Sequence, residues 1–278
     1  MNNNLISGFS VIMPLYCNEN PDNFIQSMNS LLNQTLCPNE IIVVVDGEVG
    51  PKLNKAIERY CNHELVIIVK LEKNYGIGHA RKIGIENCST NVFALMDSDD
   101  ISHNKRFEIQ YNELLKGEFD IIGGHIEEFE KKVGDLSFVR KLPLQNDEIY
   151  KYGKWRMPVN NVTLMFTRDI YNKVGGYIPL RSGEDWHLVA KWLANNARFQ
   201  NLDKILVYVR GGSNMIKRRR TRLFQFSQLK VFPYMYKLGY INFFQLTVNV
   251  SVRLIINILP ASFTSFLYSS FLRKKKKI

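Results

Sequence analysis

The chain has 278 residues, of which 45% are hydrophobic, and its formal net charge is +11 at pH 7. A chain of this size can bury a full core without covalent support, and its four cysteines lie singly, with no C-x-x-C pair. This pattern indicates neither a disulfide framework nor a zinc site, and it favours a reducing compartment. The first residues lack a basic segment followed by a long apolar run, so a secretory signal is not expected.

The charge is distributed unevenly along the chain. Residues 203–278 hold 15 of the 37 basic residues and a single acid, Asp203, which gives a net charge of +14. Residues 1–202 carry a net charge of −3. This division predicts a mildly acidic body and a basic tail that faces an anionic partner, either a membrane surface or a nucleic acid.

Short apolar runs alternate with helix-like segments over the first hundred residues. The expected strands are 9–13, 41–45, 65–69 and 92–96, and the expected helices between them are 22–34, 51–62 and 77–87. The runs at 41 and 65 are continuous and β-branched, which predicts strands that are buried on both faces. The pattern is typical of βαβ units, so we expect an α/β fold with a mixed, mainly parallel, Rossmann-like sheet flanked by helices.

Polar or small residues follow each of these four strands, at 14–18, 46–47, 72–78 and 97–100. Because ligands of such sheets bind beyond the carboxyl ends of the strands, the four strand ends predict one cleft. Further along, 102–116 is expected to be helical, 121–129 and 161–167 to contain strands, and the stretch up to 152 to be an irregular insertion. A short helix stopped by Gly175-Gly176, a helix over 184–195 and a strand at 205–209 follow.

Three carboxylates crowd the segment Asp97-Ser98-Asp99-Asp100, directly after an apolar run. The first interpretation is an N-cap for the following helix, for which one carboxylate is enough. An EF-hand loop is excluded, because Ile101 occupies the fifth position, where that loop needs an oxygen ligand. The third interpretation, which we favour, is a divalent cation that carboxylates hold together with substrate phosphates, with Asp100 capping the next helix in addition.

Five segments in order resemble the GT-A type, family 2 inverting glycosyltransferases, and in particular those of bacterial O-antigen and capsule synthesis. They are SVIMPLYCNE at 10–19, EIIVVVDG at 40–47, NYGIGHARKIGI at 74–85, MDSDD at 96–100 and GEDWHLVAKW at 183–192. The resemblance covers roughly 9–210. It implies a GT-A fold and a nucleotide-sugar donor.

The resemblance also implies roles for residues of the donor side. The nucleotide end of the cleft would be lined by Pro14, Tyr16 and Asn18, and Asp46 would pair with the uracil edge. The loop residues Asn74 and Gly76 would border the nucleotide, and Arg81 would meet its base or phosphate; the alternative for 74–78 is a plain turn. Asp97 would hold the ribose, Ser98 would complete the substrate contacts, and Asp97 and Asp99 would bind Mn²⁺ or Mg²⁺. That cation would stabilise the departing nucleoside diphosphate as a Lewis acid.

The acceptor side needs a base, because a sugar hydroxyl is a poor nucleophile until its proton is removed. Asp185 matches the family's base position, Glu184 is its partner in substrate binding, and Trp186 is expected to stack on an acceptor sugar, whereas Trp192 is expected in the core. The alternative for the two acids is an N-terminal cap. A single displacement would invert the anomeric configuration. No Q-x-x-R-W motif is present, so transfer of one sugar per encounter is expected.

The tail combines basic runs at 217–222 and 273–277 with an apolar stretch at 240–259. Arg253, Gln245 and two asparagines make a membrane crossing costly, so we expect a helix in the interface of an anionic membrane. The alternative is that these helices cover the catalytic domain's own core. Three regions are expected: a nucleotide-sugar half at 1–110, an acceptor half at 111–212 and a basic helical tail at 213–278.

The expected reaction is transfer of one hexose, from UDP-galactose or UDP-glucose, to a HexNAc-diphosphate-undecaprenyl acceptor, with a β1,3 linkage favoured. It would occur peripherally at the cytoplasmic face of the bacterial inner membrane. One rival is a sugar nucleotidyltransferase, but the first strand is not followed by a glycine-rich phosphate loop. The other is a nucleic-acid-binding protein, which the separation of the basic run from the acidic cleft disfavours, so no nucleic-acid partner is expected.

Overall fold

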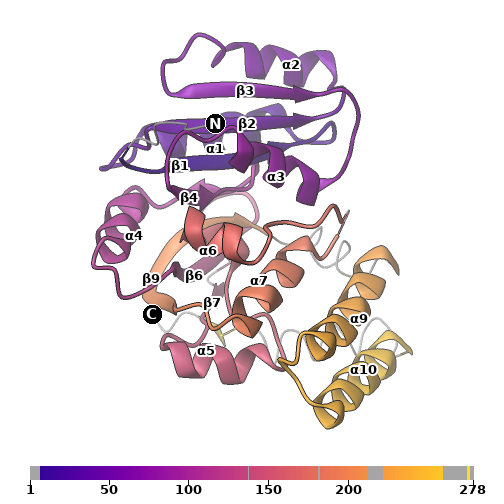
Figure 1. Cartoon of the computed structure of the whole chain (residues 1–278). Helices are drawn as coiled ribbons and strands as arrows, with labels where there is room; N and C mark the ends of the chain where they lie inside the picture. The colour runs from indigo at the N-terminus through magenta and orange to yellow at the C-terminus, as the bar shows by residue number, and fades with distance from the viewer. Residues whose placement is uncertain (1–6, 137, 181, 212–221, 259–273, 276–278) are drawn as a thin grey trace.

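The computed structural model describes residues 7–136, 138–180, 182–211, 222–258 and 274–275, and Figure 1 shows the arrangement of the elements. The helices are α1 (Pro21–Leu32), α2 (Pro51–Glu58), α3 (Ile77–Glu86), α4 (Arg106–Leu114), α5 (Asn146–Gly153), α6 (Arg168–Lys173), α7 (Glu184–Ala194), α9 (Arg222–Lys237) and α10 (Phe243–Ile258), with a 3-10 turn η1 (Asn161–Thr163). The strands are β1 (Ser10–Leu15), β2 (Glu40–Asp46), β3 (Val66–Leu71), β4 (Val92–Leu95), β5 (Ile101–Ser102), β6 (Ile121–Phe129), β7 (Phe138–Arg140), β8 (Met165–Thr167), β9 (Phe199–Arg210) and β10 (Lys274–Lys275).

One mixed sheet runs through the molecule in the order β10-β7-β6-β8-β4-β1-β2-β3, with β9 paired to β6 and β5 to β9. The N-terminal strands β3, β2, β1 and β4 are parallel, as the βαβ pattern predicts. Beyond β4 the pairing is antiparallel except between β6 and β9. The prediction of parallel strands is therefore confirmed for the first half, and the second half makes the sheet mixed.

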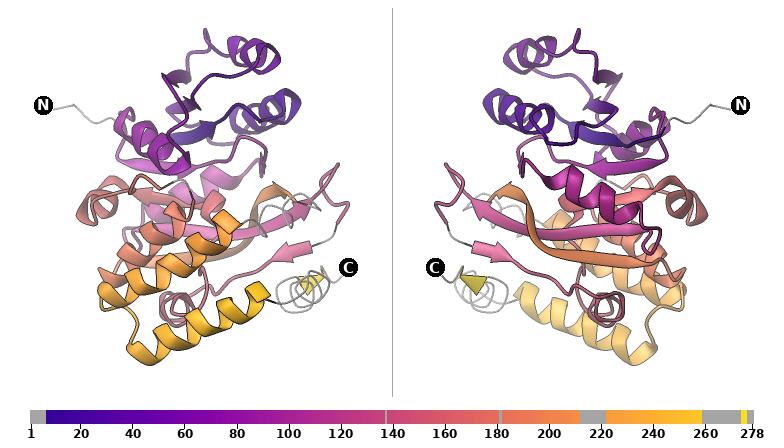
Figure 2. Two further views of the ribbon diagram at one scale, coloured as in Figure 1. Left: turned by 90° about the vertical axis from the view of Figure 1, so that its right-hand side faces the viewer. Right: turned by 90° about the vertical axis from the view of Figure 1, so that its left-hand side faces the viewer.

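Helices cover both faces of this sheet. The strand alternation is visible in β1, where Val11 and Met13 face the core under α1, α2 and α4, and Ile12 faces the core under α3, α5, α6 and α7. A third, smaller core joins α7 to the hairpin of α9 and α10 (Figure 2). The sheet thus fixes the positions of α3 and α7, whose N-terminal ends meet beside the strand ends.

Several local predictions need correction. The run at 65–69 forms β3, but Ile67 is 41% exposed, because β3 is an edge strand and not one that is covered on both faces. The stretch before residue 152 is not an irregular insertion, since it forms β7 and α5. Of the strand expected at 161–167, only Met165–Thr167 is a strand, preceded by η1. Helix α4 begins at Arg106 instead of 102.

The tail forms a helical hairpin as far as the structure describes it. Helix α9 packs one face on α7, where Val231, Phe232 and Met235 contact Trp186 and Ala190. The basic runs at 217–222 and 273–277 lie almost entirely outside the described residues, so the prediction for them is not tested. Among the helices that the structure describes, none has the length and apolar character that a membrane crossing requires.

Candidate active site

The loop before α3 is held by the carboxylate at the end of β2. Asp46 Oδ1 accepts a hydrogen bond from the backbone N–H of Tyr75 at 2.8 Å, and Asp46 Oδ2 accepts one from Gly76 at 2.9 Å. Gly76 has a φ of 94°, a conformation that glycine adopts without a steric penalty. Asn74, exposed in the same loop, donates to the Asp46 carbonyl at 3.4 Å. The plain-turn interpretation is thus correct for the backbone, and the predicted uracil contact of Asp46 has to use the lone pairs that remain.

Arg81 of α3 connects the segment after β4 to the start of α7. Its Nη2 lies 2.8 Å from Asp97 Oδ1, beyond β4, and its Nη1 lies 2.6 Å from Glu184 Oε1, the first residue of α7. With its amide oxygen turned toward the guanidinium, Asn161 accepts from both of these nitrogens at 3.1 Å. Arg81 is 2% exposed, so it positions carboxylates from inside the protein. Its predicted contact with a nucleotide base or phosphate is wrong for this arrangement, because its terminal nitrogens are engaged.

A glycine allows the two helices to approach closely enough for this bridge. A Cβ atom on Gly78, in the first turn of α3, would lie 2.9 Å from Glu184 Cβ and 2.9 Å from the Ile178 and Leu180 carbonyl oxygens. Any side chain there would push α7 and the segment before it away. The close contact of α3 and α7 therefore depends on Gly78.

Burial and neighbouring charges shift the pKa values of Arg81 and Glu184. Burial opposes the charge on Arg81, but the pKa of Arg81 still lies above its ordinary value because of Tyr177, Asp97, Glu184 and Asp185. Burial raises the pKa of Glu184 to about 7, Asp185 acts in the same direction, and Arg81 opposes the shift. Glu184 is therefore a carboxyl group that titrates near neutral pH.

The acidic segment after β4 is fixed by contacts from two neighbouring elements. Ser98 donates to Glu19 Oε2 at 2.9 Å, which ties the acidic segment to the loop after β1. Ser27 of α1 donates to the Asp97 carbonyl at 3.1 Å. The Asp97 side chain keeps 37% of its surface exposed, and Asp99 is half-buried. These two carboxylates thus stand at the strand end with part of their surface open to a ligand.

Asp100 does not begin the next helix, so that prediction is wrong. The chain continues from Asp100 into β5, which pairs with β9, and α4 begins only at Arg106. Asp100 Oδ1 instead accepts the backbone N–H of Arg210 at 2.8 Å, and Arg210 Nε donates to the Asp99 carbonyl at 3.1 Å. The end of β9 thus holds the acidic segment in place.

Asp97 and Asp99 fit a divalent cation that is shared with substrate. Among the described residues, no group of three or more His, Cys, Asp or Glu side chains is arranged to hold a metal by itself. Mg²⁺ and similar ions bind through one or two carboxylates together with substrate phosphates, so two carboxylates are sufficient for that mode. Asp97 Oδ1 already accepts from Arg81, which orients the second oxygen.

The proposed base lies at the start of α7. Asp185 is half-buried, and its Oδ1 accepts the backbone N–H of Trp186 at 2.7 Å. Asp185 is the second residue of α7, whose N-cap is Gly183, so its carboxylate lies in the first turn at the positive end of the helix. Glu184 is 4% exposed and pairs with Arg81. It therefore positions Arg81 and is not open to substrate, in contrast to the expected substrate contact.

The structure contradicts the predicted stacking role of Trp186 and confirms the predicted burial of Trp192. Trp186 is 4% exposed and its ring packs edge-on against Phe232 of α9, with 5.2 Å between the ring centroids. It therefore has no face open for stacking on an acceptor sugar. Trp192 is fully buried, as expected. On the donor side, Pro14 is buried within β1, whereas Tyr16 and Asn18 are exposed just after it.

Three site residues have no local sequence signal. Glu19 and Arg210 hold the acidic segment, and Asn161 faces Arg81. Each contacts a partner that is far away in the sequence. Glu19 lies within the quoted motif at 10–19, but its partner, Ser98, is identified only by the fold.

The parallel half of the sheet, with carboxylates beyond β4 joined through Arg81 to an acidic helix start, is the arrangement expected of a nucleotide-sugar transferase of the GT-A class. Residues 10–175 match the glycosyl transferase family 2 model. The chain is 32% identical to the UDP-Gal:alpha-D-GlcNAc-diphosphoundecaprenol beta-1,3-galactosyltransferase of Escherichia coli, covering 96% of this chain and 97% of that one. It is also 32% identical to the amylovoran biosynthesis glycosyltransferase AmsE of Erwinia amylovora, covering 94% and 97%. The chain belongs to glycosyl transferase family 2.

Solved structures agree on the fold. The mannosyltransferase of Pyrobaculum calidifontis in complex with GDP-Man and Mn²⁺ aligns with a TM-score of 0.62 at 14% identity, covering 94% of this chain and 79% of that one. TarS 1–349 of S. aureus with UDP-GlcNAc aligns with a TM-score of 0.59 at 20% identity, covering 95% and 73%. The GT-A-like fold is confirmed, and the family assignment decides against a nucleotidyltransferase.

Proposed function

We propose that this protein transfers one hexose, with galactose favoured over glucose, from a UDP-sugar to a HexNAc-diphosphate-lipid acceptor, and that it forms a β1,3 linkage. The observation that carries this proposal is the bridge of Arg81 between Asp97 and Glu184. The bridge joins the carboxylate that follows β4 to the acidic start of α7 through one guanidinium, and this supports a single site for donor and acceptor. The names of the relatives support the donor and acceptor classes.

In the proposed reaction, Asp185 accepts the proton of the acceptor hydroxyl as that oxygen attacks the anomeric carbon. Attack from the side opposite the nucleotide inverts the configuration, so an α-linked donor gives a β-linked product. Asp97 and Asp99 would hold Mn²⁺ or Mg²⁺, which supplies Lewis-acid stabilisation of the departing diphosphate. Arg81 holds Asp97 and Glu184 in fixed positions relative to one another. The bound donor and the base therefore remain correctly spaced.

The test is transfer from a panel of radiolabelled UDP- and GDP-hexoses to a synthetic GlcNAc- or GalNAc-diphosphate-lipid, with and without Mn²⁺. The proposal expects release of UDP and a β1,3-linked disaccharide from one UDP-hexose. Release of inorganic pyrophosphate would instead identify a nucleotidyltransferase. Turnover with GDP-hexoses alone, or an α-linked product, would contradict the proposal.

Peripheral binding to the cytoplasmic face of the inner membrane is part of the same proposal, and the outer face of α10 supports it. Phe243, Phe244 and Ile255 on this face are 68%, 70% and 59% exposed. Arg253 is the one charged residue in the sequence of α10, and it turns inward, with its Cζ 4.0 Å from the centre of the Phe232 ring. A surface helix usually presents its charges to water, so an uncharged aromatic face is typical of contact with lipid.

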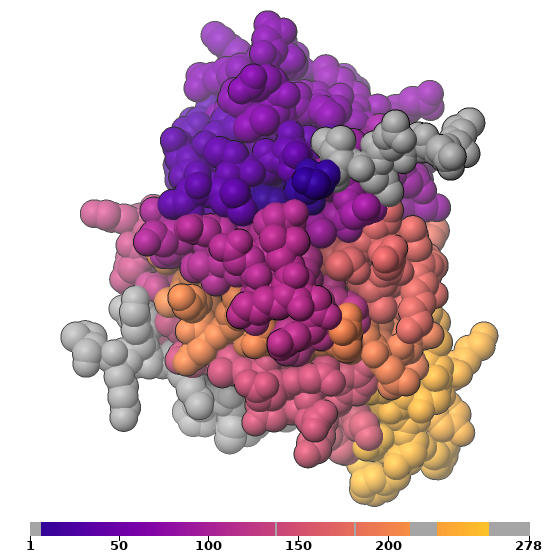
Figure 3. All heavy atoms as spheres, turned by 60° about the vertical axis from the view of Figure 1, so that its left-hand side comes forward, coloured from indigo at the N-terminus to yellow at the C-terminus, as the bar shows by residue number. Residues whose placement is uncertain are grey.

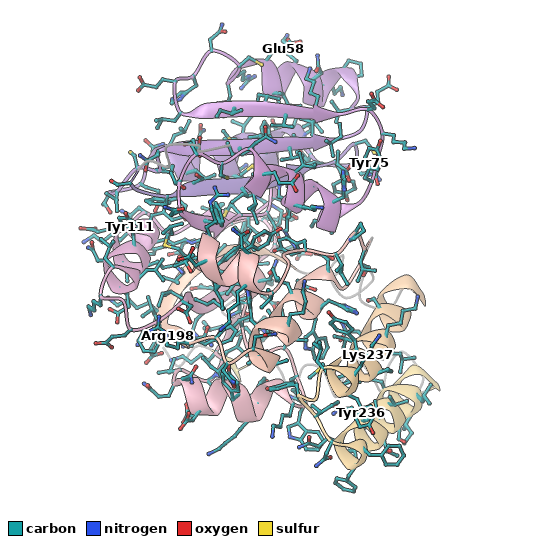
Figure 4. The ribbon with its side chains drawn as sticks, in the orientation of Figure 1. Glu58, Tyr75, Tyr111, Arg198, Tyr236 and Lys237 are labelled. Carbon is teal, nitrogen blue, oxygen red and sulfur yellow. The ribbon has the colours of Figure 1, made fainter. Side chains whose placement is uncertain are left out.

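The hairpin lies at the far corner from the nucleotide half, as the space-filling view shows (Figure 3). Tyr236 and Lys237, labelled in Figure 4, are exposed at the end of α9 beside this face. Lysines near an apolar face strengthen attraction to anionic lipid, by about 1 kcal/mol each. The basic tail predicted from the sequence fits the same membrane.

A further inference from the structure

The one charged residue in the sequence of α10, Arg253, is half-buried and points into the protein. Its Nη2 donates to the Trp155 carbonyl at 2.7 Å, and its Nη1 donates to Asn249 Oδ1 at 3.1 Å. No carboxylate of the described residues forms an ion pair with it. Burial without an anionic partner opposes the charge, and an apolar residue would pack here at lower cost. The position therefore favours a role other than stability.

The guanidinium of Arg253 lies against two aromatic rings that belong to different helices. Its Cζ is 4.0 Å from the centre of the Phe232 ring of α9 and 5.7 Å from the centre of the Trp186 ring of α7. The two rings pack edge-on, with 5.2 Å between their centroids. A cation within about 6 Å of a ring centre is attracted to the face of the ring. Arg253 thus joins α10 to both α9 and α7.

The indole of Trp186 is held by these ring contacts and not by a hydrogen bond. Its Nε1 is buried and has no hydrogen-bond partner within the described part of the chain. A buried indole N–H usually finds a partner, which would fix the plane of the ring. The orientation of the Trp186 ring therefore depends on Phe232 and Arg253.

The backbone of Trp186 in turn contacts the proposed base. The Trp186 N–H donates to Asp185 Oδ1 at 2.7 Å. Within the described ranges, this is the one hydrogen bond that the Asp185 carboxylate accepts. A displacement of Trp186 would therefore change the direction of that carboxylate.

Helix α9 also contacts α7 on both sides of Asp185, as the packing of the two helices in Figure 1 allows. A Cβ atom on Gly183 would lie 3.1 Å from Ser227 Cβ, so the helix start and α9 touch closely. The His187 ring lies 4.9 Å from the Tyr234 ring, measured between centroids. The hairpin of α9 and α10 thus borders the residues before and after the proposed base.

We propose that Arg253 is a positioning residue for the general base: by holding the Trp186 indole against Phe232, it fixes the start of α7 and the direction of the Asp185 carboxylate. This proposal rests on the proposed function, because it takes Asp185 as the group that accepts the proton of the acceptor hydroxyl. A base acts only within hydrogen-bond reach of that proton, so a small displacement slows transfer without weakening donor binding.

The test measures transfer by the full chain to the synthetic HexNAc-diphosphate-lipid in solution, without membranes. Arg253→Met keeps an unbranched side chain but removes the charge and both hydrogen bonds. We expect kcat to fall about 10- to 100-fold, while the donor KM and the Mn²⁺ affinity of the UDP-saturated protein stay unchanged. Arg253→Lys keeps a cation beside the rings and is expected to recover part of kcat.

A second measurement asks whether Arg253 acts through Asp185. In the Asp185→Asn background, Arg253→Met is expected to change kcat less than about twofold, because the group that it positions is already gone. A loss of the same size in both backgrounds would overturn the proposal, since Arg253 would then act on another part of the site.

Arg168→Met is the matched control. Arg168 is also half-buried, its Cζ lies 4.6 Å from the Phe93 ring, and its Nη2 donates to the Cys88 and Thr90 carbonyls at 2.8 and 2.7 Å, before β4 and opposite the acidic segment. It is expected to lower the melting temperature and to keep kcat. Equal kcat losses in the two Met variants, or wild-type kcat in a folded Arg253→Met protein, would overturn the positioning role alone. No transfer by the wild type would overturn the proposed function as well.

Discussion

Arg81 and Glu184 form a buried ion pair, with 2.6 Å between Nη1 and Oε1, that joins two helices 103 residues apart in the sequence. The side chains are 3% and 6% exposed. A charge buried this deeply is stable only with its partner, so the pair commits α3 and α7 to one relative position. The distance between Asp97 and the acidic start of α7 depends on that position.

Removing the guanidinium tests this coupling. Arg81→Gln leaves Glu184 without its cation, and we expect a loss of about 3–5 kcal/mol in the free energy of unfolding. The double variant Arg81→Gln/Glu184→Gln should recover part of that loss, since no buried charge remains. Urea unfolding of the wild type, Arg81→Gln, Glu184→Gln and the double variant gives the coupling energy. A loss below about 1 kcal/mol in the single variant would argue against a buried pair.

The pKa of Glu184 predicts a pH dependence of stability. The folded value is about 7 and the ordinary value is 4.5, so between these values the native state binds more protons than the unfolded state. Stability from this group is greatest at the acidic end and falls as the pH rises toward 7. We expect the Tm of the wild type to fall relative to that of Glu184→Gln between pH 5 and about pH 7.5. Parallel Tm curves for the two proteins would contradict the raised pKa.

Asp99 is predicted to bind the divalent cation. Asp99→Asn should weaken Mn²⁺ binding in the presence of UDP about 10- to 100-fold, because it removes an anionic ligand. Calorimetric titration of Mn²⁺ into the UDP-saturated protein measures this without turnover. Asp169→Asn, at an exposed position in the first turn of α6, is the matched control. Equal Mn²⁺ affinity of the Asp99 variant and the control would remove Asp99 from the metal site.

Asp185 is predicted to be the general base. Asp185→Asn keeps an oxygen that can accept the Trp186 N–H, so the helix start should be preserved while the base is lost. We expect kcat to fall about 10²- to 10⁴-fold, with an unchanged donor KM. Initial rates over a range of donor concentrations, at saturating acceptor, provide the measurement. Near wild-type turnover would assign the base to another residue.

The face of α10 is predicted to contact anionic lipid. Replacing Phe243 and Phe244 by Ser should release the protein from vesicles of phosphatidylglycerol and phosphatidylethanolamine in a flotation assay, because about 2 kcal/mol or more of apolar burial is lost per ring. Leu115→Ser is the control, since Leu115 is 64% exposed after α4 and away from the hairpin. Flotation equal to that of the wild type would exclude this face. A shift from dimer to monomer in solution would instead assign the face to a second copy.

The sequence by itself determined the parallel half of the sheet and the family. The β-branched runs of β1 and β2 have the length and pattern of buried strands. Carboxylates lie at the ends of strands in this half of the sheet. These are local properties, because strand periodicity and turn chemistry depend on adjacent residues. The positions of Asp46, Asp97 and Asp99 at the carboxyl ends of the parallel strands were therefore predictable from the sequence.

Only the tertiary structure decided how these groups are supported. The sequence predicts that Arg81 lines the nucleotide site, but Arg81 is buried between Asp97 and Glu184. The sequence also predicts that Trp186 stacks on a sugar, but α9 covers its ring. The helical pattern of the sequence also does not predict that the Arg253 side chain points inward. The physical reason is that burial and ion pairing are set by partners distant in sequence. A local pattern states what a residue is able to do, and packing decides which partner it meets.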